Sequence, residues 1–314
     1  MTLKEAVLQL ASTTDLSNRE IAQKLGCSRR SVRRYAGRWE RRIRDRSVRT
    51  ETIVPDIAKI LLFDIETAPM EVYTWSLYPK FIPHEMVIHD WSMLSWSAKW
   101  LFSDTIMSQC VTSKEAVNRT DLSILRGIWE LLNTADIVIA HNGVKFDVKK
   151  LNTKFVLNDM SPPMSYRVID TLDVARKNFS FASNSLDYLV RQMSDSGKLD
   201  TGGFDLWKRC MKGDPAALEK MVDYNRHDVA IMEEVYLQVR PWIRSHPNVG
   251  LYIDTDDTVC TNCGNTNLQW GGYYYTPAGK YASFRCSNCG AIGRSRFSAL
   301  GKDERKKLVL AVAH

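Results

Sequence analysis

Ile60-Leu61-Leu62-Phe63-Asp64-Ile65-Glu66-Thr67 is the stretch from which the fold can be predicted. Five of its first six residues are apolar, which favours a strand buried inside a sheet. Residues i and i+2 of a strand point to the same face, so the carboxylates of Asp64 and Glu66 should converge. Burying such a pair is costly unless a cation lies beside it. The stretch therefore predicts a divalent-metal site, and the alternative is a strand end that frays into solvent.

The composition is that of an ordinary globular protein. The chain has 314 residues, of which 44% are hydrophobic and 25% charged, enough for two or three domains. Its apolar runs are shorter than the roughly 18 residues of a membrane span, and no signal-peptide core follows Met1. We therefore expect a cytoplasmic protein that has no membrane partner.

Basic residues gather toward both ends of the chain. Residues 1–58 contain 13 Lys/Arg and 7 Asp/Glu, and residues 251–314 contain 8 and 5, whereas residues 59–250 contain 22 and 24. Basic segments attract polyanions, because Lys and Arg pair with phosphates. This distribution predicts nucleic acid as the partner of the flanks and a cation-binding centre between them.

The N-terminal segment is patterned as a helix-turn-helix. Apolar spacing predicts a helix over Leu3–Ala11, Ser17 can cap a second helix, and Gly26-Cys27-Ser28 forms a turn before a third helix over Arg29–Arg46. Residues 17–34 resemble the helix-turn-helix family of DNA-binding proteins. The expected nucleic-acid contacts are Arg29, Arg30, Ser31, Arg33 and Arg34. A helical bundle with a solvated basic face is the alternative.

Two later stretches supply further carboxylates. His141-Asn142-Gly143-Val144-Lys145-Phe146-Asp147 follows a predicted buried strand and places Asp147 in the first turn of a helix that begins around Lys145. Tyr224 and Asp228 are four residues apart and share one face of a helix, which should begin with Asp214 as its cap and Pro215 in its first turn. The alternation of strands and helices indicates a mixed α/β sheet.

Taken in order, these stretches resemble a nuclease family. Asp64-Ile-Glu66, Asn142-x3-Phe146-Asp147 and Tyr224-x3-Asp228 resemble the motifs of DEDD exonucleases with a tyrosine in the third motif. The second motif also resembles that of proofreading domains in family B DNA polymerases. Further motifs resemble YprB-type ribonuclease-H-like exonucleases, notably those coded by bacteriophages: Ala140-His-Asn-Gly, Val168-Ile-Asp-Thr, Gly202-Gly-Phe-Asp-Leu-Trp and Asp223-Tyr-Asn. The resemblance covers about residues 58–245.

The resemblance implies a ribonuclease-H-like mixed sheet and a metal-dependent 3′–5′ exonuclease that acts on DNA. Its metal ligands would be Asp64, Glu66, Asp147 and Asp228. They would hold two Mg²⁺ or Mn²⁺ ions, with Asp64 as the bridge, and hard oxygen ligands suit these ions. Two such ions about 4 Å apart can generate hydroxide and neutralise the leaving oxygen.

Three other residues have roles by the same resemblance. Tyr224 would orient the attacking water as a hydrogen-bonding group, since a phenol of pKa about 10 is a poor base near neutral pH. Phe146 would pack either against the terminal base or in the core. Asn142 would either bond the substrate strand or shape the turn.

The C-terminal segment has the spacing of a zinc ribbon. Cys260-Thr-Asn-Cys263-Gly and Cys286-Ser-Asn-Cys289-Gly are separated by 22 residues and offer four thiolates to one structural Zn²⁺. A pair of disulfides is the alternative. Aromatic and basic side chains are mixed there as in single-strand binders: Trp270, Tyr273, Tyr274, Tyr275, Lys280, Tyr281, Phe284, Arg285, Arg294 and Arg296.

The expected organisation has four segments. They are a helix-turn-helix domain with a basic helical extension (1–50), a linker (51–57), a ribonuclease-H-like exonuclease domain (58–250) and a zinc ribbon (251–314). The function could serve phage DNA replication, repair or proofreading, in the host cytoplasm if a phage encodes the chain. Alternatives are a DDE-type transposase or integrase, an RNA-directed exonuclease, and an inert DNA-binding regulator. A polymerase or replication partner and the oligomeric state stay open.

Overall fold

The computed structural model describes residues 2–13, 18–27, 31–32, 58–194 and 202–309. The chain forms two compact units, Met1–Pro55 and Asp56–His314, and each has its own core. Within the described ranges, no helix combines the length and the apolar character that a membrane span requires.

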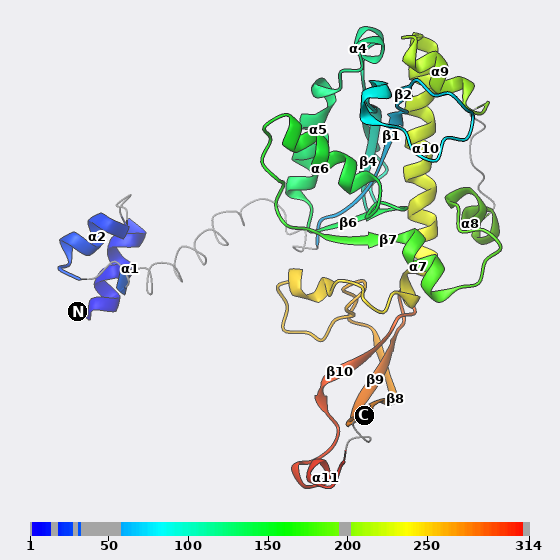
Figure 1. Ribbon diagram of the computed structural model, residues 1–314. Coiled ribbons are helices and arrows are strands. Elements are labelled where there is room, and N and C mark those ends of the chain that lie inside the picture. Colours follow the sequence, from blue (N-terminus) through cyan, green and yellow to red (C-terminus); the bar gives the residue numbers. More distant parts are fainter. Residues whose placement is uncertain (1, 14–17, 28–30, 33–57, 195–201, 310–314) are drawn as a thin grey trace. The chain divides into compact units, whose positions relative to one another are not determined.

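The N-terminal unit contains α1 (Leu3–Thr13) and α2 (Asn18–Lys24) (Figure 1). Its core consists of Val7, Ile21, Ala22 and Val32, all of them buried. The predicted helix from Leu3 is therefore confirmed. Val32, which lies within the predicted third helix, is buried in this core. The capping residue Ser17 and the predicted contacts Arg29, Arg30, Arg33 and Arg34 lie outside the described residues, and Ser31 is half-buried.

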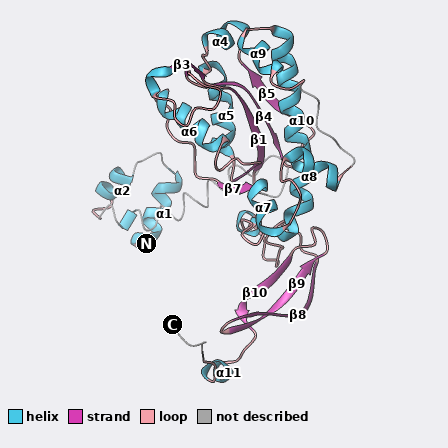
Figure 2. Ribbon diagram, turned by 45° about the vertical axis from the view of Figure 1, so that its right-hand side comes forward, coloured by secondary structure: helices cyan, strands magenta, loops and turns pink. Residues whose placement is uncertain are grey.

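A mixed five-stranded sheet forms the centre of the second unit (Figure 2). Its strand order is β5-β4-β1-β6-β7, with antiparallel β5/β4 and β4/β1 pairs and parallel β1/β6 and β6/β7 pairs. The strands are β1 (Ile60–Ala68), β4 (Ser92–Trp100), β5 (Met107–Cys110), β6 (Ile137–Ala140) and β7 (Arg167–Asp170). A short antiparallel pair, β2 (Glu71–Val72) and β3 (Val87–His89), follows β1, and η1 (His84–Met86) precedes β3. The predicted ribonuclease-H-like fold class is confirmed.

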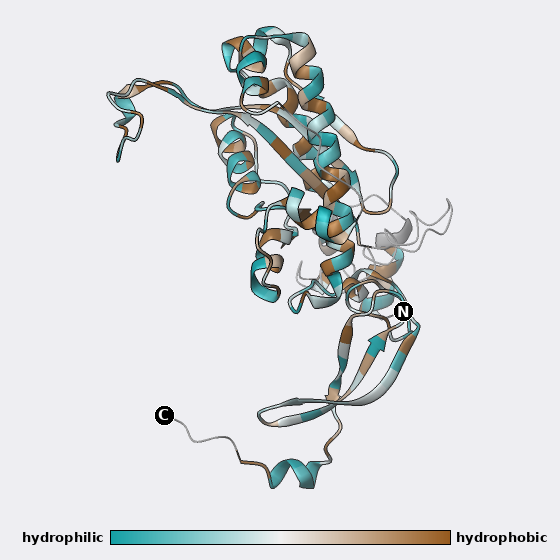
Figure 3. Cartoon of the chain, turned by 90° about the vertical axis from the view of Figure 1, so that its right-hand side faces the viewer, coloured by the Kyte–Doolittle hydropathy of each residue, from teal (hydrophilic) through white to brown (hydrophobic). Residues whose placement is uncertain are grey.

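The two faces of β1 belong to different cores, as the alternation of a strand requires. Leu61, Phe63 and Ile65 pack with α5 (Leu122–Thr134) and α6 (Asp147–Leu157). Ile60 and Leu62 face the other core, which α7 (Thr171–Asn178), α8 (Leu186–Met193) and most of α10 supply. Apolar residues gather where the sheet meets these helices (Figure 3). Side chains two residues apart in a strand point to the same face, so Asp64 and Glu66 lie on the face of Ile60 and Leu62. This is the face that α10 covers.

The longest described helix is α10 (Pro215–Val239), with 25 residues. Asp214 caps it by accepting hydrogen bonds from the N–H groups of Ala216 (3.0 Å) and Ala217 (3.3 Å), and Pro215 lies in its first turn, as predicted. Before it come α4 (Ser113–Asn118) and α9 (Asp205–Met211). Figure 1 shows α10 running beside the sheet and ending where the C-terminal strands begin.

A three-stranded antiparallel sheet follows, in the order β10-β9-β8. Its strands are β8 (Leu268–Thr276), β9 (Gly279–Cys286) and β10 (Ile292–Ser298), and α11 (Lys302–Lys306) comes last. The connection from α10 passes through η2 (Arg240–Trp242) and η3 (Val249–Tyr252). Arg240, only 4% exposed, donates through Nε to the carbonyl of Asn262 (3.0 Å), whose side-chain amide donates to the carbonyl of Arg240 (3.1 Å). This reciprocal pair joins the first cysteine pair to the end of α10.

A buried ion pair tests how the central unit is held together. Lys154 Nζ lies 2.7 Å from Asp121, with side chains 13% and 7% exposed, and Asp121 also accepts from the N–H of Met93 (2.8 Å). Lys154→Met would leave that carboxylate buried without its cation and should cost about 3–5 kcal/mol of unfolding free energy in urea denaturation. The exposed Arg126–Glu130 pair is the control, and Arg126→Met should cost less than about 1 kcal/mol. Equal losses in the two variants would contradict this account.

Candidate functional site

Three carboxylates converge between β1 and α10. Asp64 and Glu66 come from β1 and Asp228 from the middle of α10, and their ligand oxygens all lie within 4.8 Å of one another. Asp228 is 5% exposed, and the other two side chains are half-buried. Like charges this close destabilise one another, and a divalent cation removes that penalty. The donor set is all carboxylate oxygen, which fits Mg²⁺ or Mn²⁺ rather than a softer metal.

Tyr224 borders this acidic cluster one helical turn before Asp228. Its side chain is 7% exposed and its ring packs edge-on against Trp207, with centroids 6.1 Å apart. Burial, together with the charges of Asp228 and Glu66 and a hydrogen bond to Asp228, raises the pKa of Tyr224. The phenol therefore stays protonated and acts as a hydrogen-bond donor at this site.

Asp147, the fourth predicted acid, lies beside the cluster and outside the group of three. Its Oδ1 accepts a hydrogen bond from the N–H of Ile65 (3.1 Å), which lies between Asp64 and Glu66 in the chain. The N–H is available because β1 pairs with β6 only over Ile60–Leu62 and then continues past it. Burial raises the pKa of the Asp147 carboxyl to about 7. The structure thus places Asp147 against the backbone of the strand that carries the first two acids.

Asn225 is a site residue that motif spacing missed. It is fully buried and donates from Nδ2 to Oδ2 of Asp64 (2.7 Å), while its Oδ1 accepts from the hydroxyl of Ser95 (3.4 Å). The hydrogen bond fixes one rotamer of Asp64. The sequence feature that could have identified Asn225 is an amide on the apolar face of a helix, one residue after Tyr224.

The turn between β6 and α6 is held by Asp170. Its carboxylate accepts from the N–H groups of Asn142 (2.9 Å) and Val144 (3.1 Å), and it also caps α7 through Leu172 (3.1 Å). Asn142 has φ of 69°, and a Cβ on Gly143 would lie 2.3 Å from the Cβ of Ala140, so glycine is required there. The turn delays the start of α6 from the predicted Lys145 to Asp147. Asn142 therefore shapes the turn through its backbone.

A pocket of about 600 Å³ lies where β1 ends. Phe146 lines it and is 37% exposed, so its ring is not part of the core. Lys150 lies in the same pocket, with Nζ 3.7 Å from the centroid of the Trp91 ring and 4.9 Å from that of Phe146. Trp207, which contacts Tyr224, also lines it. An aromatic pocket with one ammonium group thus adjoins the acidic cluster.

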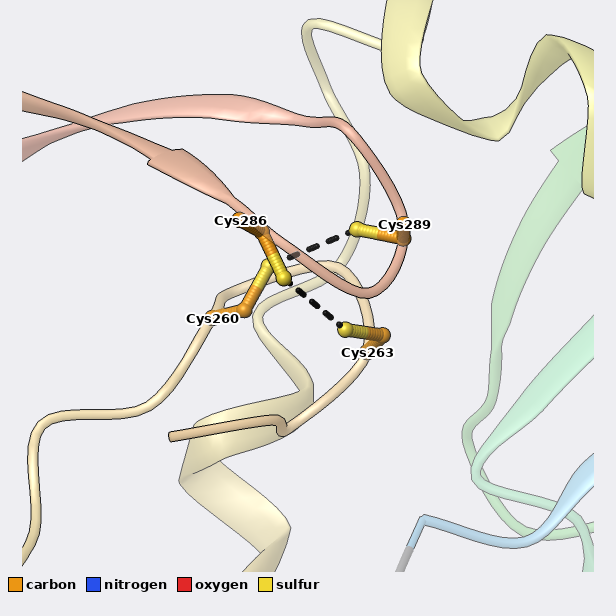
Figure 4. A group of neighbouring side chains, drawn as sticks. All are labelled: Cys260, Cys263, Cys286 and Cys289. Carbon is orange, nitrogen blue, oxygen red and sulfur yellow. Dashed lines mark hydrogen bonds between the residues drawn. The ribbon is translucent and has the colours of Figure 1, made fainter. Parts of the chain in front are cut away.

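Four cysteines form a second candidate metal centre (Figure 4). Their sulfur atoms lie within 4.8 Å of one another, with Cys260–Cys289 at 3.6 Å and Cys263–Cys286 at 3.5 Å. These distances exceed the roughly 2 Å of a disulfide and are near the roughly 3.8 Å edge of a tetrahedron with 2.3 Å zinc–sulfur bonds. A hydrogen bond from Cys260 lowers the pKa of Cys263 and so favours its thiolate. The four sulfur donors fit one zinc ion.

Two family models match parts of the chain. Residues 103–239 match RNase_H_2, described as RNase_H superfamily, and residues 3–45 match HTH_23, described as a homeodomain-like domain. The chain therefore combines an RNase_H superfamily domain with an N-terminal homeodomain-like helix-turn-helix. Fold, match and acidic cluster together support a nuclease.

None of the curated proteins matches the chain. Among the solved structures, the chain is distantly similar to a DNA polymerase. The family B DNA polymerase from the hyperthermophilic archaeon Pyrobaculum calidifontis is similar with a TM-score of 0.45 and 15% sequence identity. The similarity covers 61% of this chain and 26% of the polymerase chain. The similarity thus spans about a quarter of the polymerase chain.

The cysteine centre makes a prediction about metal content. Protein purified without chelators should carry one zinc ion per chain, and Cys263→Ser should lose it because three thiolates bind zinc far more weakly. Elemental analysis by mass spectrometry measures both. Cys110→Ser is the control, since Cys110 is remote from the centre and should keep full zinc occupancy. A native protein that contains no zinc would refute the assignment.

Asn225 makes a separate prediction about positioning. Asn225→Ala frees the Asp64 carboxylate and should weaken Mn²⁺ binding by about 10- to 100-fold in calorimetric titration. The control is Asn158→Ala, which removes an amide that donates only to the carbonyl of Lys154 in its own helix (2.8 Å). Unchanged Mn²⁺ affinity in Asn225→Ala would show that the hydrogen bond to Asp64 does not orient a metal ligand.

Proposed function

We propose that the chain is a metal-dependent 3′–5′ exonuclease that hydrolyses the phosphodiester bonds of DNA. The observation that carries this proposal is the convergence of Asp64, Glu66 and Asp228 within 4.8 Å inside a ribonuclease-H-like fold. The 3′–5′ polarity and the DEDD and YprB-like assignments rest on the ordered sequence motifs.

Asp64, Glu66, Asp147 and Asp228 are proposed to hold two Mg²⁺ or Mn²⁺ ions. When bound, these ions supply a hydroxide near neutral pH and neutralise charge on the leaving oxygen. Asp64 is oriented for this role by Asn225, and Asp147 is held at Ile65, directly between the two acids of β1. The proximity of Asp147 to that strand supports its place as the fourth ligand.

Tyr224 is proposed to orient the attacking water. Burial and the hydrogen bond to Asp228 favour the protonated phenol, which suits a hydrogen-bonding group rather than a base. Its hydroxyl hydrogen-bonds to Asp228, so the oxygen lies beside a carboxylate of the cluster. With its proton donated to Asp228, the phenol oxygen can accept a hydrogen bond from the water and so fix the direction of the water without changing its charge.

The aromatic pocket is proposed to receive the terminal nucleotide. Phe146, Trp91 and Trp207 offer ring surfaces on which a base can stack, and Lys150 can pair with a phosphate. The burial of Lys150 lowers the pKa of its ammonium group, and a bound phosphate would raise that pKa again. A pocket that accepts a single base next to the acids favours cleavage at a strand end over cleavage within a strand.

The homeodomain-like match supports DNA rather than RNA as the polymer that is bound. We extend the proposal to Arg29, Arg30, Ser31, Arg33 and Arg34 as DNA contacts, and to a replication or polymerase partner. A role in phage replication, repair or proofreading would place the protein in the host cytoplasm.

The decisive experiment is a digestion assay with end-labelled oligonucleotides. Asp64→Ala or Asp228→Ala should lower Mg²⁺-dependent release of nucleotides from a 3′ end by about 10²–10³-fold or more, because each removes a ligand that stabilises charge in the transition state. Glu219→Ala is the matched control, since this exposed acid lies on the same helix as Asp228 and should leave the rate unchanged.

The products distinguish the alternatives. Release of mononucleotides from 3′-labelled DNA supports the proposal, whereas strand-transfer products would favour a transposase or integrase. Full activity in both acid variants would reject the site. Faster digestion of RNA than of DNA would reject the proposed substrate.

A further inference from the structure

The C-terminal sheet is free of negative charge. Residues 258–301 contain four Lys/Arg and no Asp/Glu. Several of its large aromatic side chains are exposed, with Tyr273 at 51%, Tyr274 at 49% and Tyr275 at 66%. The small core around the four cysteines uses none of these tyrosines. This part of the structure therefore carries more aromatic and basic surface than its own folding needs.

Strand register divides these side chains between two faces. Tyr274 pairs with Tyr281, and Arg294 lies over both rings, 4.1 Å from the Tyr281 centroid and 5.6 Å from that of Tyr274. We call this side the inner face. On the opposite side, Nζ of Lys280 lies 3.9 Å from the centroid of the Tyr273 ring. We call that side the outer face. Each face thus presents one well-defined pair of an aromatic ring and a cation.

The inner face lines a groove of about 1010 Å³ together with α7 and η2. Its cationic side chains are Lys177, Arg244 and Arg294, and its exposed aromatic rings are Tyr274 and Trp242. Trp242 is 53% exposed and fixed edge-on against Phe179, with centroids 5.6 Å apart. Rings and cations therefore come from both walls of the groove.

The acidic side chains of the groove are already engaged. Asp170 accepts hydrogen bonds from the backbone of the β6–α6 turn and of α7. Asp173 lies 3.9 Å from Lys177. The remaining cations, Arg244 and Arg294, have no carboxylate within ion-pair distance among the described residues. The charge balance of the groove favours a polyanion.

One end of the groove reaches the catalytic edge of the sheet. Val144 and Asp170 both line it. Val144 belongs to the turn that precedes Asp147, and Asp170, at the end of β7, accepts a hydrogen bond from the N–H of Val144 (3.1 Å). The groove therefore begins at the turn that leads into α6, the helix on which Asp147 lies.

We propose that this groove binds single-stranded nucleic acid and guides the substrate strand to or from the acidic cluster. Exposed rings on both walls can stack only on bases that are not paired, whereas a duplex keeps its bases inside. The guanidinium groups fit the phosphates between the stacked bases. The groove as a binding site stands independently, and its link to cleavage rests on the proposed nuclease function.

Fluorescence anisotropy of labelled oligonucleotides of about 12 nucleotides tests the binding. The full chain carries Asp64→Ala to prevent cleavage, and oligo(dT), oligo(U) and a duplex are compared. Tyr274→Ala with Arg294→Ala should weaken single-strand binding by roughly 5- to 150-fold for each lost stacked base. It should also reduce the slope of log K against log salt by about 0.7 for the lost cation.

Two further variants sharpen the test. Tyr273→Ala with Lys280→Ala removes the matched pair from the outer face and should leave affinity within about twofold. Lys177→Ala with Arg244→Ala removes cations from the other wall and should reduce the salt slope by about 1.4. The second variant lies outside the C-terminal sheet, so it decides the question even if the first groove variant loses its zinc.

The outcomes separate this inference from the nuclease proposal. Equal losses from the two faces would overturn the groove, and so would an unchanged single-strand affinity in both groove variants. Because the N-terminal unit is itself proposed to bind duplex DNA, the duplex serves as the control, and its affinity should not change in the groove variants. In the cleavage-competent chain, the groove variants should slow the digestion of long single strands more than that of a dinucleotide. A wild-type chain that binds single strands through the groove but releases no nucleotide would support the groove and reject the nuclease.

Discussion

Carboxylates held close together in a partly buried space repel one another, and the centre of this protein is arranged around that constraint. Asp64 and Glu66 come from one strand and Asp228 from the helix that covers it, so the rigid β1–α10 contact sets their separation. Desolvation also penalises Asp147, whose pKa rises for this reason. A divalent cation would relieve both effects.

The surrounding hydrogen bonds hold these acids in place. Asn225 fixes Asp64, the N–H of Ile65 fixes Asp147, and Asp170 fixes the turn from which α6 starts. The same helix that presents Tyr224 and Asp228 ends at Arg240, whose buried guanidinium bonds to Asn262 in the first cysteine pair. Within Asp56–His314, α10 therefore connects the acidic cluster to the sulfur centre.

Sequence patterns predicted those features that depend on local periodicity. The alternation in Ile60–Thr67 predicted the shared face of Asp64 and Glu66, and the cap Asp214 with Pro215 predicted the start of α10. The two CxxC pairs predicted a four-sulfur cluster, which the structure forms. The domain boundaries and the DNA contacts from Arg29 to Arg34 stay predictions.

Features that depend on distant contacts could not be predicted in this way. The hydrogen bond from Asn225 to Asp64 joins residues 161 positions apart, and no spacing rule connects them. The late start of α6 depends on Asp170, which belongs to the next strand, and on a positive φ at Asn142. The motif spacing also predicted the same metal-binding role for all four acids. In the structure, Asp147 accepts a hydrogen bond from the backbone of Ile65 and lies outside the group formed by the other three.

The central claim is that these acids hold divalent cations, and anomalous diffraction from a crystal soaked in Mn²⁺ tests it most directly. The account predicts manganese density within about 2.0–2.3 Å of oxygens of Asp64, Glu66 and Asp228, with Asp147 as the further ligand. Strong manganese density elsewhere, and none between β1 and α10, would contradict it.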